Sequence, residues 1–379
     1  MTEGTDMRHV TYQQRIEYDV VNAQDLFHPD NPALLSVGRI ENARRFVVVD
    51  SNVERHFSAE MQHYFSHHKV DAKIISFAAG EENKTLENFV SITRELDSFP
   101  IHRRDEPIIA IGGGVLTDVV GFVAGSYRRG IPHIKVPTTL MGYVDAAIGI
   151  KTGINFNNHK NRIGVFTPPQ KVLLDRSFLK TLPKRHIRNG VCEIIKLAII
   201  KDAELFCLLE EYGAQSIDAQ FQNEAGGRIL DRAISSILAE LEPNLFEEDL
   251  ARKVDFGHTF SYGLETRHEA HLLHGEAVLL DIVLSTLIAK ARKLLSEQDT
   301  SRVFQLMVRL GMMLDTTVLD PRLLWQSLEE RTYHRNGLQR VPMPCGIGGC
   351  VFLNDVNADE IESAVRLLED WITIKNEII

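Results

Sequence analysis

Two histidines, His258 and His274, lie sixteen residues apart in the segment DFGHTFSYGLETRHEAHLLHGEAV, which covers residues 255–278. Catalytic zinc sites use three nitrogen or oxygen ligands from the protein and leave one position open. Glu193, in the apolar run GVCEIIKLAII, is a candidate third ligand because a buried carboxylate needs a cation or a metal as its partner. From the residues alone, two hydrogen-bonded core histidines remain the more economical interpretation, since the chain contains 15 histidines.

A glycine-rich turn has the composition of a phosphate-binding site. The segment IIAIGGGVLTDVVGFVAG (108–125) runs from an apolar strand through three glycines into a helix. Gly113 and Gly114 would let backbone N–H groups approach a pyrophosphate at the helix N-terminus. Asp118 lies one turn into that helix, and Asp50 ends an earlier strand, where a carboxylate can bind a ribose hydroxyl. An ordinary tight turn is the alternative.

The segment PTTLMGYVDAAIGIKTGINFNNHKNRIG (137–164) mixes glycines with charged and amide side chains. Such a mixture can hold phosphates and hydroxyls, and its candidate groups are Asp145, Lys151, Lys160 and Asn161. A solvated loop without any function explains the same composition equally well.

Short apolar runs alternate with helical patterns in the first half of the chain. Strands are predicted at residues 45–50, 72–77, 107–114, 133–137 and 171–175. Helical periodicity at 56–68 and 84–99 separates the first three, which is typical of a doubly wound, Rossmann-like parallel sheet. Beyond about residue 175 the periodicity is almost entirely helical. We therefore predict an α/β domain at residues 1–172 and an all-α domain at residues 173–379.

Composition excludes several classes of protein. A chain of 379 residues exceeds one typical core, and a net charge of −10 offers no basic surface for nucleic acid. The four cysteines form no C-x-x-C pair, so we expect a reduced, cytoplasmic protein. The N-terminus has no basic segment followed by an apolar run, and the longest apolar stretch is broken by Asp281. We therefore expect neither a signal peptide nor a membrane partner.

Taken together, these segments resemble the sugar phosphate cyclases, the superfamily that includes 3-dehydroquinate synthase. The resemblance spans roughly residues 40–355 and is carried by GEENK (80–84), GGGVLTDVVGFVAGSYRRG (112–130), PTTL (137–140), DAAIGIKTGINFNNHKNRIG (145–164), EIIK (193–196), FGHT (256–259) and LHGEA (273–277). It implies a dehydroquinate synthase-like fold, in which an NAD-binding α/β domain precedes a helical metal-binding domain. It also implies a homodimer and a small sugar phosphate as substrate.

The resemblance also implies the residues of the site. Zinc or cobalt would be held by Glu193, His258 and His274. NAD would be lined by Asp50, Asn52, Glu81, Lys84, Gly113, Gly114, Asp118, Thr138, Thr139 and Lys160. The substrate and its phosphate would be faced by Asp145, Lys151, Lys160, Asn161, Lys196 and Arg129.

The reaction that the resemblance implies begins with transient oxidation of one hydroxyl by NAD. Loss of phosphate, return of the hydride, ring opening and an intramolecular aldol closure would follow. NAD would be regenerated in each cycle, while the metal would act as a Lewis acid.

Three positions argue against a carboxylated substrate. Where 3-dehydroquinate synthase typically has Arg, Asn and His around the FGHT motif, this chain has Ala251, Asp255 and Tyr262. Losing an Arg and gaining an Asp disfavours a substrate carboxylate. Leu241, Asp255 and His334 instead resemble the cyclases that convert sedoheptulose 7-phosphate to 2-epi-5-epi-valiolone, although Tyr262 stands where that group has proline. Helix packing for Leu241 and an N-cap for Asp255 are the alternatives.

Other activities remain open at this point. Another sedoheptulose 7-phosphate cyclase, making 2-epi-valiolone or desmethyl-4-deoxygadusol, ranks next, followed by 3-dehydroquinate synthase. An iron-type polyol dehydrogenase shares the GGG-x-x-x-D turn and a metal in a helical domain, but it gives no reason for the polar segment at 151–164 and would produce net NADH. A regulator that binds NAD without turnover is the non-enzymatic alternative.

Overall fold

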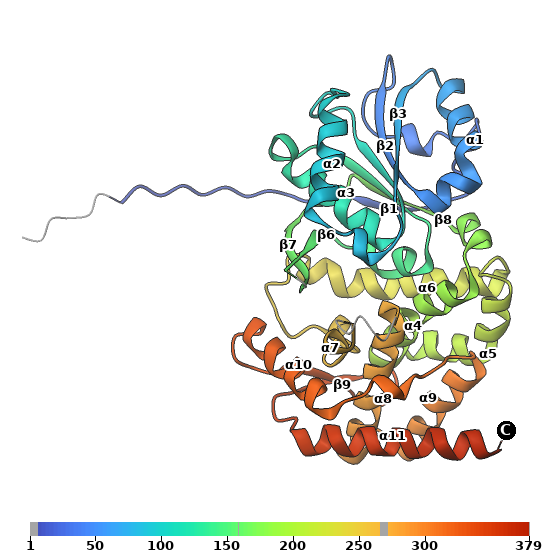
Figure 1. Cartoon of the computed structure of the whole chain (residues 1–379), viewed down its shortest axis with the longest axis vertical. Coiled ribbons are helices and arrows are strands. Elements are labelled where there is room, and N and C mark those ends of the chain that lie inside the picture. The colour runs from blue at the N-terminus through green and yellow to red at the C-terminus, as the bar shows by residue number, and fades with distance from the viewer. Residues whose placement is uncertain (1–6, 158, 266–271, 379) are drawn as a thin grey trace, which may run out of the picture.

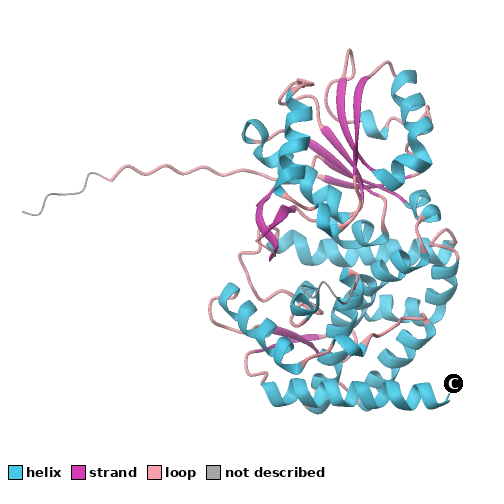
Figure 2. Cartoon of the chain, in the orientation of Figure 1, coloured by secondary structure: helices cyan, strands magenta, loops and turns pink. Residues whose placement is uncertain are grey.

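Two units, one built around a sheet and one built of helices, make up the chain (Figures 1 and 2). This computed structural model describes residues 7–157, 159–265 and 272–378. An extended N-terminal segment projects from the side of the sheet unit (Figure 1). Among the described residues, no helix combines the length and the apolar character needed to cross a membrane.

Six parallel strands form the sheet in the order β1-β8-β5-β4-β2-β3. They are β1 (Asp19–Ala23), β2 (Arg44–Asp50), β3 (Asp71–Phe77), β4 (Ile108–Gly112), β5 (His133–Pro137) and β8 (Lys171–Asp175). Five of them lie where the apolar runs predicted strands, so the doubly wound sheet is confirmed. The sequence did not predict β1, whose short segment DVVNA contains Asp19 and Asn22 and pairs with β8, with Asp19 opposite Lys171. The predicted domain boundary at residue 172 falls inside β8 and stays a prediction.

The two faces of the sheet are covered by different helices. Alternate residues of β2 point to opposite faces: Val47 and Val49 pack against α1 (Ser51–His67), whereas Phe46 and Val48 pack against α2 (Leu86–Asp97) and α3 (Gly114–Ser126). Because all six strands run in one direction, the carboxyl ends of β2, β4 and β5 meet at one edge. This edge lies toward the helical unit. Gly114 after β4 approaches Ala146, and the short helical turn η4 (Gly142–Ala146) contacts the helices α4 (Lys184–Ile200) and α6 (Glu224–Leu241).

The polar segment after β5 forms an antiparallel hairpin of β6 (Lys151–Phe156) and β7 (His159–Phe166) rather than a loop. Its strands come very close at Gly153, where an added Cβ would lie 2.6 Å from the carbonyl oxygen of Ile163. The hairpin packs on α3 and lies beside the junction of the two units (Figure 1). The predicted phosphate-binding residues are therefore held on regular structure.

The helical unit surrounds one central helix. Its helices are α4 (Lys184–Ile200), α5 (Ala203–Asp218), α6 (Glu224–Leu241), α7 (Ser261–Glu265), α8 (His274–Ala291), α9 (Glu297–Arg309), α10 (Pro321–His334) and α11 (Ala358–Ile378). α8 is apolar on all sides and contacts α4, α7 and α11, as expected for a core helix. A small hairpin of β9 (Val341–Pro344) and β10 (Cys350–Leu353) also belongs to this unit, which the sequence predicted to be all-α.

Candidate active site

Glu193, His258 and His274 come together in the helical unit, with one possible ligand atom of each lying within 4.8 Å of the others. Nε2 of His274 is 3.5 Å and Nε2 of His258 is 3.9 Å from Oε1 of Glu193. The two imidazole rings lie 5.2 Å apart and are tilted relative to each other. Two imidazoles and one carboxylate at this spacing match the donor set of a catalytic zinc, with a fourth position left for a substrate oxygen.

Glu193 has the environment of a metal ligand rather than of a simple ion pair. Its side chain is fully buried, and the ammonium of Lys196 faces Oε2. Neither carboxylate oxygen accepts a hydrogen bond of good geometry from the described residues. Burial alone would raise the pKa of Glu193, but Lys196 and the two histidines outweigh burial and hold this pKa below its usual value. The carboxylate is therefore charged and has free lone pairs for a cation.

The Nδ1 atoms of both histidines are engaged, which directs the Nε2 atoms toward Glu193. Nδ1 of His258 lies 3.2 Å from the carbonyl oxygen of Phe256, and Nδ1 of His274 lies 3.0 Å from Oε1 of Glu265. Burial lowers the pKa of His258 to about 3. Burial would also lower the pKa of His274, but Glu265 and Glu193 raise it to about 10. The acids around His274 thus favour a positive charge at its ring. A metal ion bound to Nε2 could supply this charge in place of the proton.

Two glycines explain why these ligands can meet. Gly257 has φ +77°, a conformation that favours glycine, and it turns the chain so that His258 faces α4. Gly275, at the start of α8, lies so close to α4 that an added Cβ would be 2.1 Å from the carbonyl oxygen of Asn189. The buried Asp281 accepts the backbone N–H of Ser261 at 2.9 Å and so fixes the start of α7. The FGHT and LHGEA motifs therefore set the backbone geometry that brings the predicted ligands together.

The predicted nucleotide-binding residues gather at the carboxyl edge of the sheet. Added Cβ atoms at Gly112 and Gly113 would lie 3.0 Å from Cβ of Asp50 and 3.1 Å from Cγ2 of Thr139. Asp50 also caps α1 by accepting the N–H of Asn52 at 2.8 Å. No described side chain caps the first turn of α3, so its N–H groups are available to an anion. This edge fits a dinucleotide phosphate.

The PTTL segment joins two parts of the site. One is the carboxyl edge of the sheet, which we call the nucleotide edge, and the other is the group of Glu193, His258 and His274, which we call the metal cluster. Leu140 follows Thr138 and Thr139 and packs so closely on α4 that an added Cβ at Gly190 would lie 2.6 Å from Cβ of Leu140. Gly190 precedes Glu193 by three residues on the same helix. One short segment therefore connects a predicted NAD contact to a predicted metal ligand.

Hydrogen bonds tie the β6–β7 hairpin to residues of the sheet unit. The ammonium of Lys84 lies 2.6 Å from Oδ2 of Asp118 and also donates to Asn161. The amide of Asn155 donates to Glu81 at 2.8 Å. Burial would lower the pKa of Lys84, but Asp118 and Glu81 raise it, so the ammonium stays charged. Glu81, Lys84, Asp118 and Asn161 thus form one group.

The predicted substrate lysines all face acidic partners. Lys160 lies 2.6 Å from Oε2 of Glu265, and Lys151 lies 2.9 Å from Oε1 of Glu247. Lys196, fully buried, is 3.9 Å from Oδ1 of Asp145 on the η4 turn. These lysines come from β6, β7 and α4.

Asp255 and His334 differ in their surroundings. The Asp255 carboxylate is buried and is engaged by the guanidinium groups of Arg252, Arg331 and Arg335. His334 ends α10 with an exposed side chain, and the structure does not bring it into the cluster. Leu241 packs near Gly149, just before Lys151.

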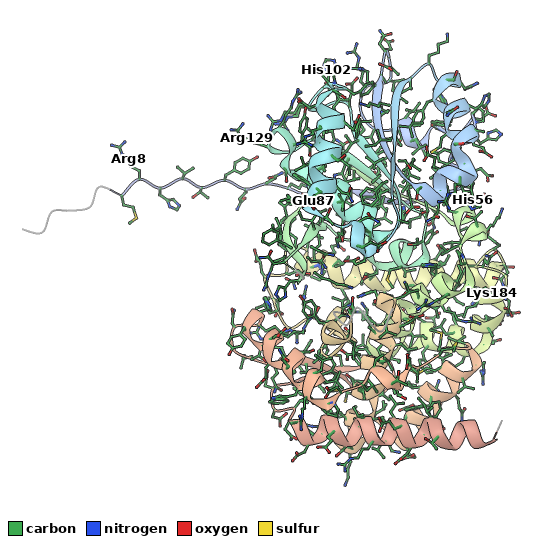
Figure 3. All side chains as sticks on the ribbon, viewed as in Figure 1. Arg8, His56, Glu87, His102, Arg129 and Lys184 are labelled. Carbon is green, nitrogen blue, oxygen red and sulfur yellow. The ribbon has the colours of Figure 1, made fainter. Side chains whose placement is uncertain are left out.

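Arg129 lies apart from the other predicted site residues. It is exposed and precedes β5, and its carbonyl oxygen accepts from Arg103 in the loop that precedes β4. Both loops are at the amino edge of the sheet, whereas the nucleotide edge is at the carboxyl end. A strand of five residues spans about 16 Å. Figure 3 shows Arg129 at the outer margin of the sheet unit.

Three groups that the sequence did not single out also belong to this region. Glu265 bridges His274 and Lys160, Glu247 pairs with Lys151, and the fully buried Lys135 donates to the carbonyl oxygen of Gly149 at 2.9 Å. Burial lowers the pKa of Lys135 to about 8. Metal-binding histidines usually donate to a carboxylate, so a partner such as Glu265 could be expected. No spacing rule shows which carboxylate in the sequence takes this role.

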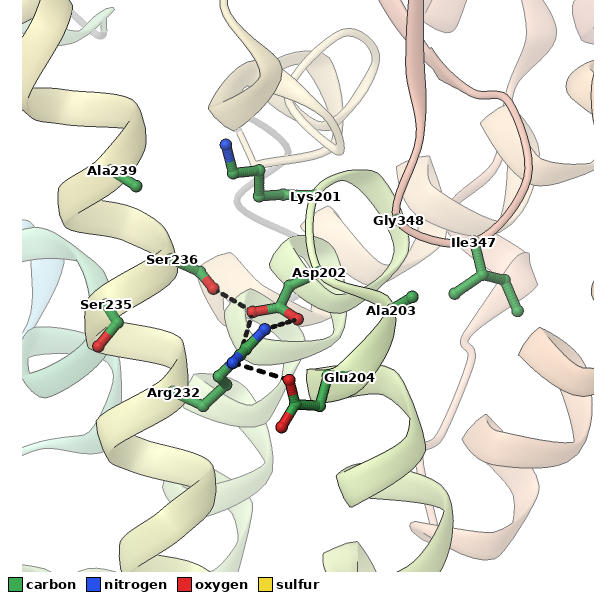
Figure 4. A pocket seen from close by; sticks show the side chains of 10 residues that line it. All are labelled: Lys201, Asp202, Ala203, Glu204, Arg232, Ser235, Ser236, Ala239, Ile347 and Gly348. Carbon is green, nitrogen blue, oxygen red and sulfur yellow. Dashed lines mark hydrogen bonds and ion pairs between the residues drawn. The ribbon is translucent and has the colours of Figure 1, made fainter.

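A hollow of about 510 Å³ lies elsewhere, between the α4–α5 junction, α6 and the turn at Gly348 (Figure 4). Its charged groups satisfy one another: Asp202 accepts from Arg232 at 2.6 Å and from Ser236, and Lys201 pairs with Glu240. None of the predicted site residues lines it. We therefore place the chemistry at the metal cluster and not in this hollow.

Comparison with known proteins agrees with this geometry. The family models for the N-terminal and C-terminal parts of 3-dehydroquinate synthase match residues 74–189 and 190–332. A 2-epi-5-epi-valiolone synthase of Streptomyces albus is 49% identical over 94% of this chain and 89% of its own length. A demethyl-4-deoxygadusol synthase of Trichormus variabilis is 37% identical over 94% and 88%. The solved structure of ValA, a 2-epi-5-epi-valiolone synthase from Streptomyces hygroscopicus with NAD+ and Zn2+ bound, is 42% identical, with a TM-score of 0.92 over 96% of this chain and 99% of that one.

Proposed function

Because this chain belongs to the 3-dehydroquinate synthase family, we propose that it is a sugar phosphate cyclase that converts sedoheptulose 7-phosphate to 2-epi-5-epi-valiolone and phosphate. The observation that carries the proposal is the meeting of Glu193, His258 and His274 beside the lysine-bearing hairpin. The higher identity to a 2-epi-5-epi-valiolone synthase than to a demethyl-4-deoxygadusol synthase supports the product. The reaction is a cyclising elimination, so the enzyme would be a lyase.

The cofactors would be NAD and zinc or cobalt, as the relative ValA holds NAD+ and Zn2+. Glu193, His258 and His274 would hold the metal, since the same three donors accept either ion. Asp50, Gly113, Gly114 and Thr138 would hold NAD at the carboxyl edge of the sheet, with Thr139 beside them. When bound, NAD supplies a reversible hydride acceptor and the metal supplies a Lewis acid.

The side chains of this chain would bind and orient the substrate. Lys151 and Lys160 are paired with carboxylates. A substrate phosphate would replace these carboxylates as the partner, because lysine binds phosphate as a point charge. Lys196 and Asp145 lie beside the metal cluster and would contact the sugar hydroxyls. Burial raises the pKa of Asp145, and Lys196 only partly opposes this shift, so Asp145 can hold a proton near the substrate.

Arg129 can serve the phosphate only from a second copy of the chain, because its own copy holds it at the opposite edge of the sheet. This placement supports the expected homodimer. Mixing Arg129→Ala with Glu193→Ala should restore about a quarter of the wild-type rate, because about half of randomly exchanged dimers are mixed and each has one intact site. No recovery in verified mixed dimers would place Arg129 outside the reaction.

The direct test is to incubate the purified protein with sedoheptulose 7-phosphate, NAD and zinc and to identify the cyclitol by NMR. We expect 2-epi-5-epi-valiolone and an equal amount of phosphate, with no net NADH. Formation of 2-epi-valiolone or demethyl-4-deoxygadusol would overturn the product and leave the cyclase class standing. Net NADH without phosphate release would indicate a polyol dehydrogenase instead.

A further inference from the structure

Three guanidinium groups converge on the carboxylate of Asp255. Nη2 of Arg252 donates to Oδ1 at 2.7 Å and to Oδ2 at 2.9 Å, Nη2 of Arg335 donates to Oδ2 at 2.8 Å, and Nη2 of Arg331 lies 3.3 Å from Oδ2. Arg252 precedes the FGHT turn, whereas Arg331 and Arg335 are supplied by the end of α10 and the residue after it. We call Arg252, Arg331 and Arg335 the arginine cage.

The arginine cage contains more positive charge than its own acids neutralise. Ion pairs join the three arginines of the cage, together with Lys151, to only two carboxylates, those of Asp255 and Glu247. Nε of Arg252 and Nε of Arg331 are buried and have no hydrogen-bond partner among the described residues. The three Nη2 atoms, in contrast, surround the two oxygens of the Asp255 carboxylate, as charged donors do when they bind a carboxylate.

The arginine cage lies next to the metal cluster. The backbone N–H of His258 donates to the carbonyl oxygen of Asp255 at 2.9 Å, so both residues belong to one turn. Glu247 connects Arg252 to Lys151, one of the predicted phosphate ligands. A carboxylate bound by the cage would therefore lie beside the metal ligands and the phosphate-binding hairpin.

We propose that Asp255 fills, from within the chain, a carboxylate-binding subsite formed by Arg252, Arg331 and Arg335, so that the active site accepts uncharged sugar chains and rejects carboxylated ones. A substrate carboxylate at this place would meet the Asp255 carboxylate and find its arginine partners occupied. A neutral hydroxymethyl end meets no such repulsion. This inference rests on the proposed function for its substrate, but the anion subsite itself does not.

The first experiment tests the subsite without turnover. Removing Asp255 leaves buried guanidinium groups without their partner, which destabilises the fold. We expect Asp255→Ala, loaded with zinc and NAD, to unfold at a lower temperature than the wild type and to regain several degrees in formate but not in chloride of equal ionic strength. The matched control is Asp202→Ala, which removes a similarly buried carboxylate from Arg232, a residue whose side chain is 40% exposed and can be solvated instead. A formate effect that is no larger in Asp255→Ala than in the wild type or in Asp202→Ala would overturn the subsite.

The second experiment tests the selectivity. Dissociation constants of sedoheptulose 7-phosphate and of a heptulosonate 7-phosphate, whose chain ends in a carboxylate, are measured by calorimetry. We expect their ratio to move toward the heptulosonate by about tenfold or more in Asp255→Ala and in Asp255→Asn. Asp255→Asn preserves the shape of the side chain and carries the test if Asp255→Ala does not fold. An unchanged ratio in the folded variant contradicts the proposal, whereas absence of sedoheptulose 7-phosphate binding by the wild type would contradict the proposed function instead.

Discussion

The nucleotide edge of the sheet and the metal cluster of the helical unit are built on opposite principles. The edge consists of small residues packed against one another, such as Gly113 against Thr139 and Gly114 against Ala146. The cluster consists of charged groups that face one another, such as the buried Glu193 and Lys196 and the half-buried His274. Added atoms should therefore weaken NAD binding at the nucleotide edge, and removed charges should weaken metal binding at the metal cluster.

The strongest challenge to this contrast is the loss of the Glu193 carboxylate. Glu193→Ala should lose bound metal and essentially all turnover together, because two imidazoles alone leave the ion without its anionic ligand. Elemental analysis and the cyclase assay measure both quantities. The matched control is Glu240→Ala, which removes a carboxylate of α6 that pairs with Lys201 at the end of α4. This variant should keep its metal and its turnover. An unchanged metal content in Glu193→Ala would refute the ligand assignment.

Adding atoms at the nucleotide edge should have the next largest effect. An added Cβ at Gly114 would lie 2.9 Å from Cβ of Ala146, and the branched side chain of valine would need still more room. Gly114→Val should weaken NAD binding by about tenfold to a hundredfold through overpacking and leave the metal in place. At Gly149 an added Cβ meets Leu241 at an ordinary 3.9 Å, so Gly149→Ala is the control. Calorimetric titration with NAD decides, and normal affinity in Gly114→Val would show that the close packing is irrelevant.

Loss of a charge next to a predicted metal ligand should have an effect of comparable size, on zinc binding instead of NAD binding. Glu265 orients His274 and pairs with Lys160, so Glu265→Ala should weaken zinc binding about 10- to 100-fold. Glu265→Gln should be intermediate, because its amide oxygen can still accept from Nδ1. Competition with a zinc indicator gives the affinities. Equal affinities in the wild type and both variants would remove Glu265 from the metal site.

The smallest effect should come from a charge that is far from the chemistry. Burial would raise the pKa of Asp202, but Arg232 and Ser236 lower it below 3.8. Its stabilising contribution, about 1 kcal/mol, should be complete above pH 3.8 and be lost as the pH falls through the lower folded value. The difference in urea midpoint between the wild type and Asp202→Asn should thus be larger at pH 7 than at pH 3. A change in metal content in this variant would mean that the hollow of Figure 4 is coupled to the cluster.

Much of the sheet unit could be predicted because its strands follow a simple pattern. HIKVP and KVLLD gave β5 and β8 with their observed bounds, since parallel strands covered on both faces are continuously apolar. β1 was not predicted, because its short segment contains polar residues and only its pairing with β8 defines it as a strand. The β6–β7 hairpin escaped because its mixed polar composition is also that of a loop, and its close strand contact depends on Gly153 and Gly164.

The ligand set was predictable and its surroundings were not. The resemblance to the sugar phosphate cyclases implied Glu193, His258 and His274 as ligands, and the structure brings these three side chains together. The arginines around Asp255 lie up to 80 residues away in sequence, and Arg331 and Arg335 reach Asp255 because the end of α10 lies beside it. For Arg129, a motif marks the residue and says nothing about which copy of the chain would receive it.

Anomalous diffraction at the zinc edge, from crystals of the protein loaded with zinc and NAD, tests the central claim most directly. The account predicts one peak at about 2.0–2.2 Å from an oxygen of Glu193 and from Nε2 of both His258 and His274, beside the nicotinamide ring. A peak held by other residues, or one from which Glu193 is absent, would contradict it.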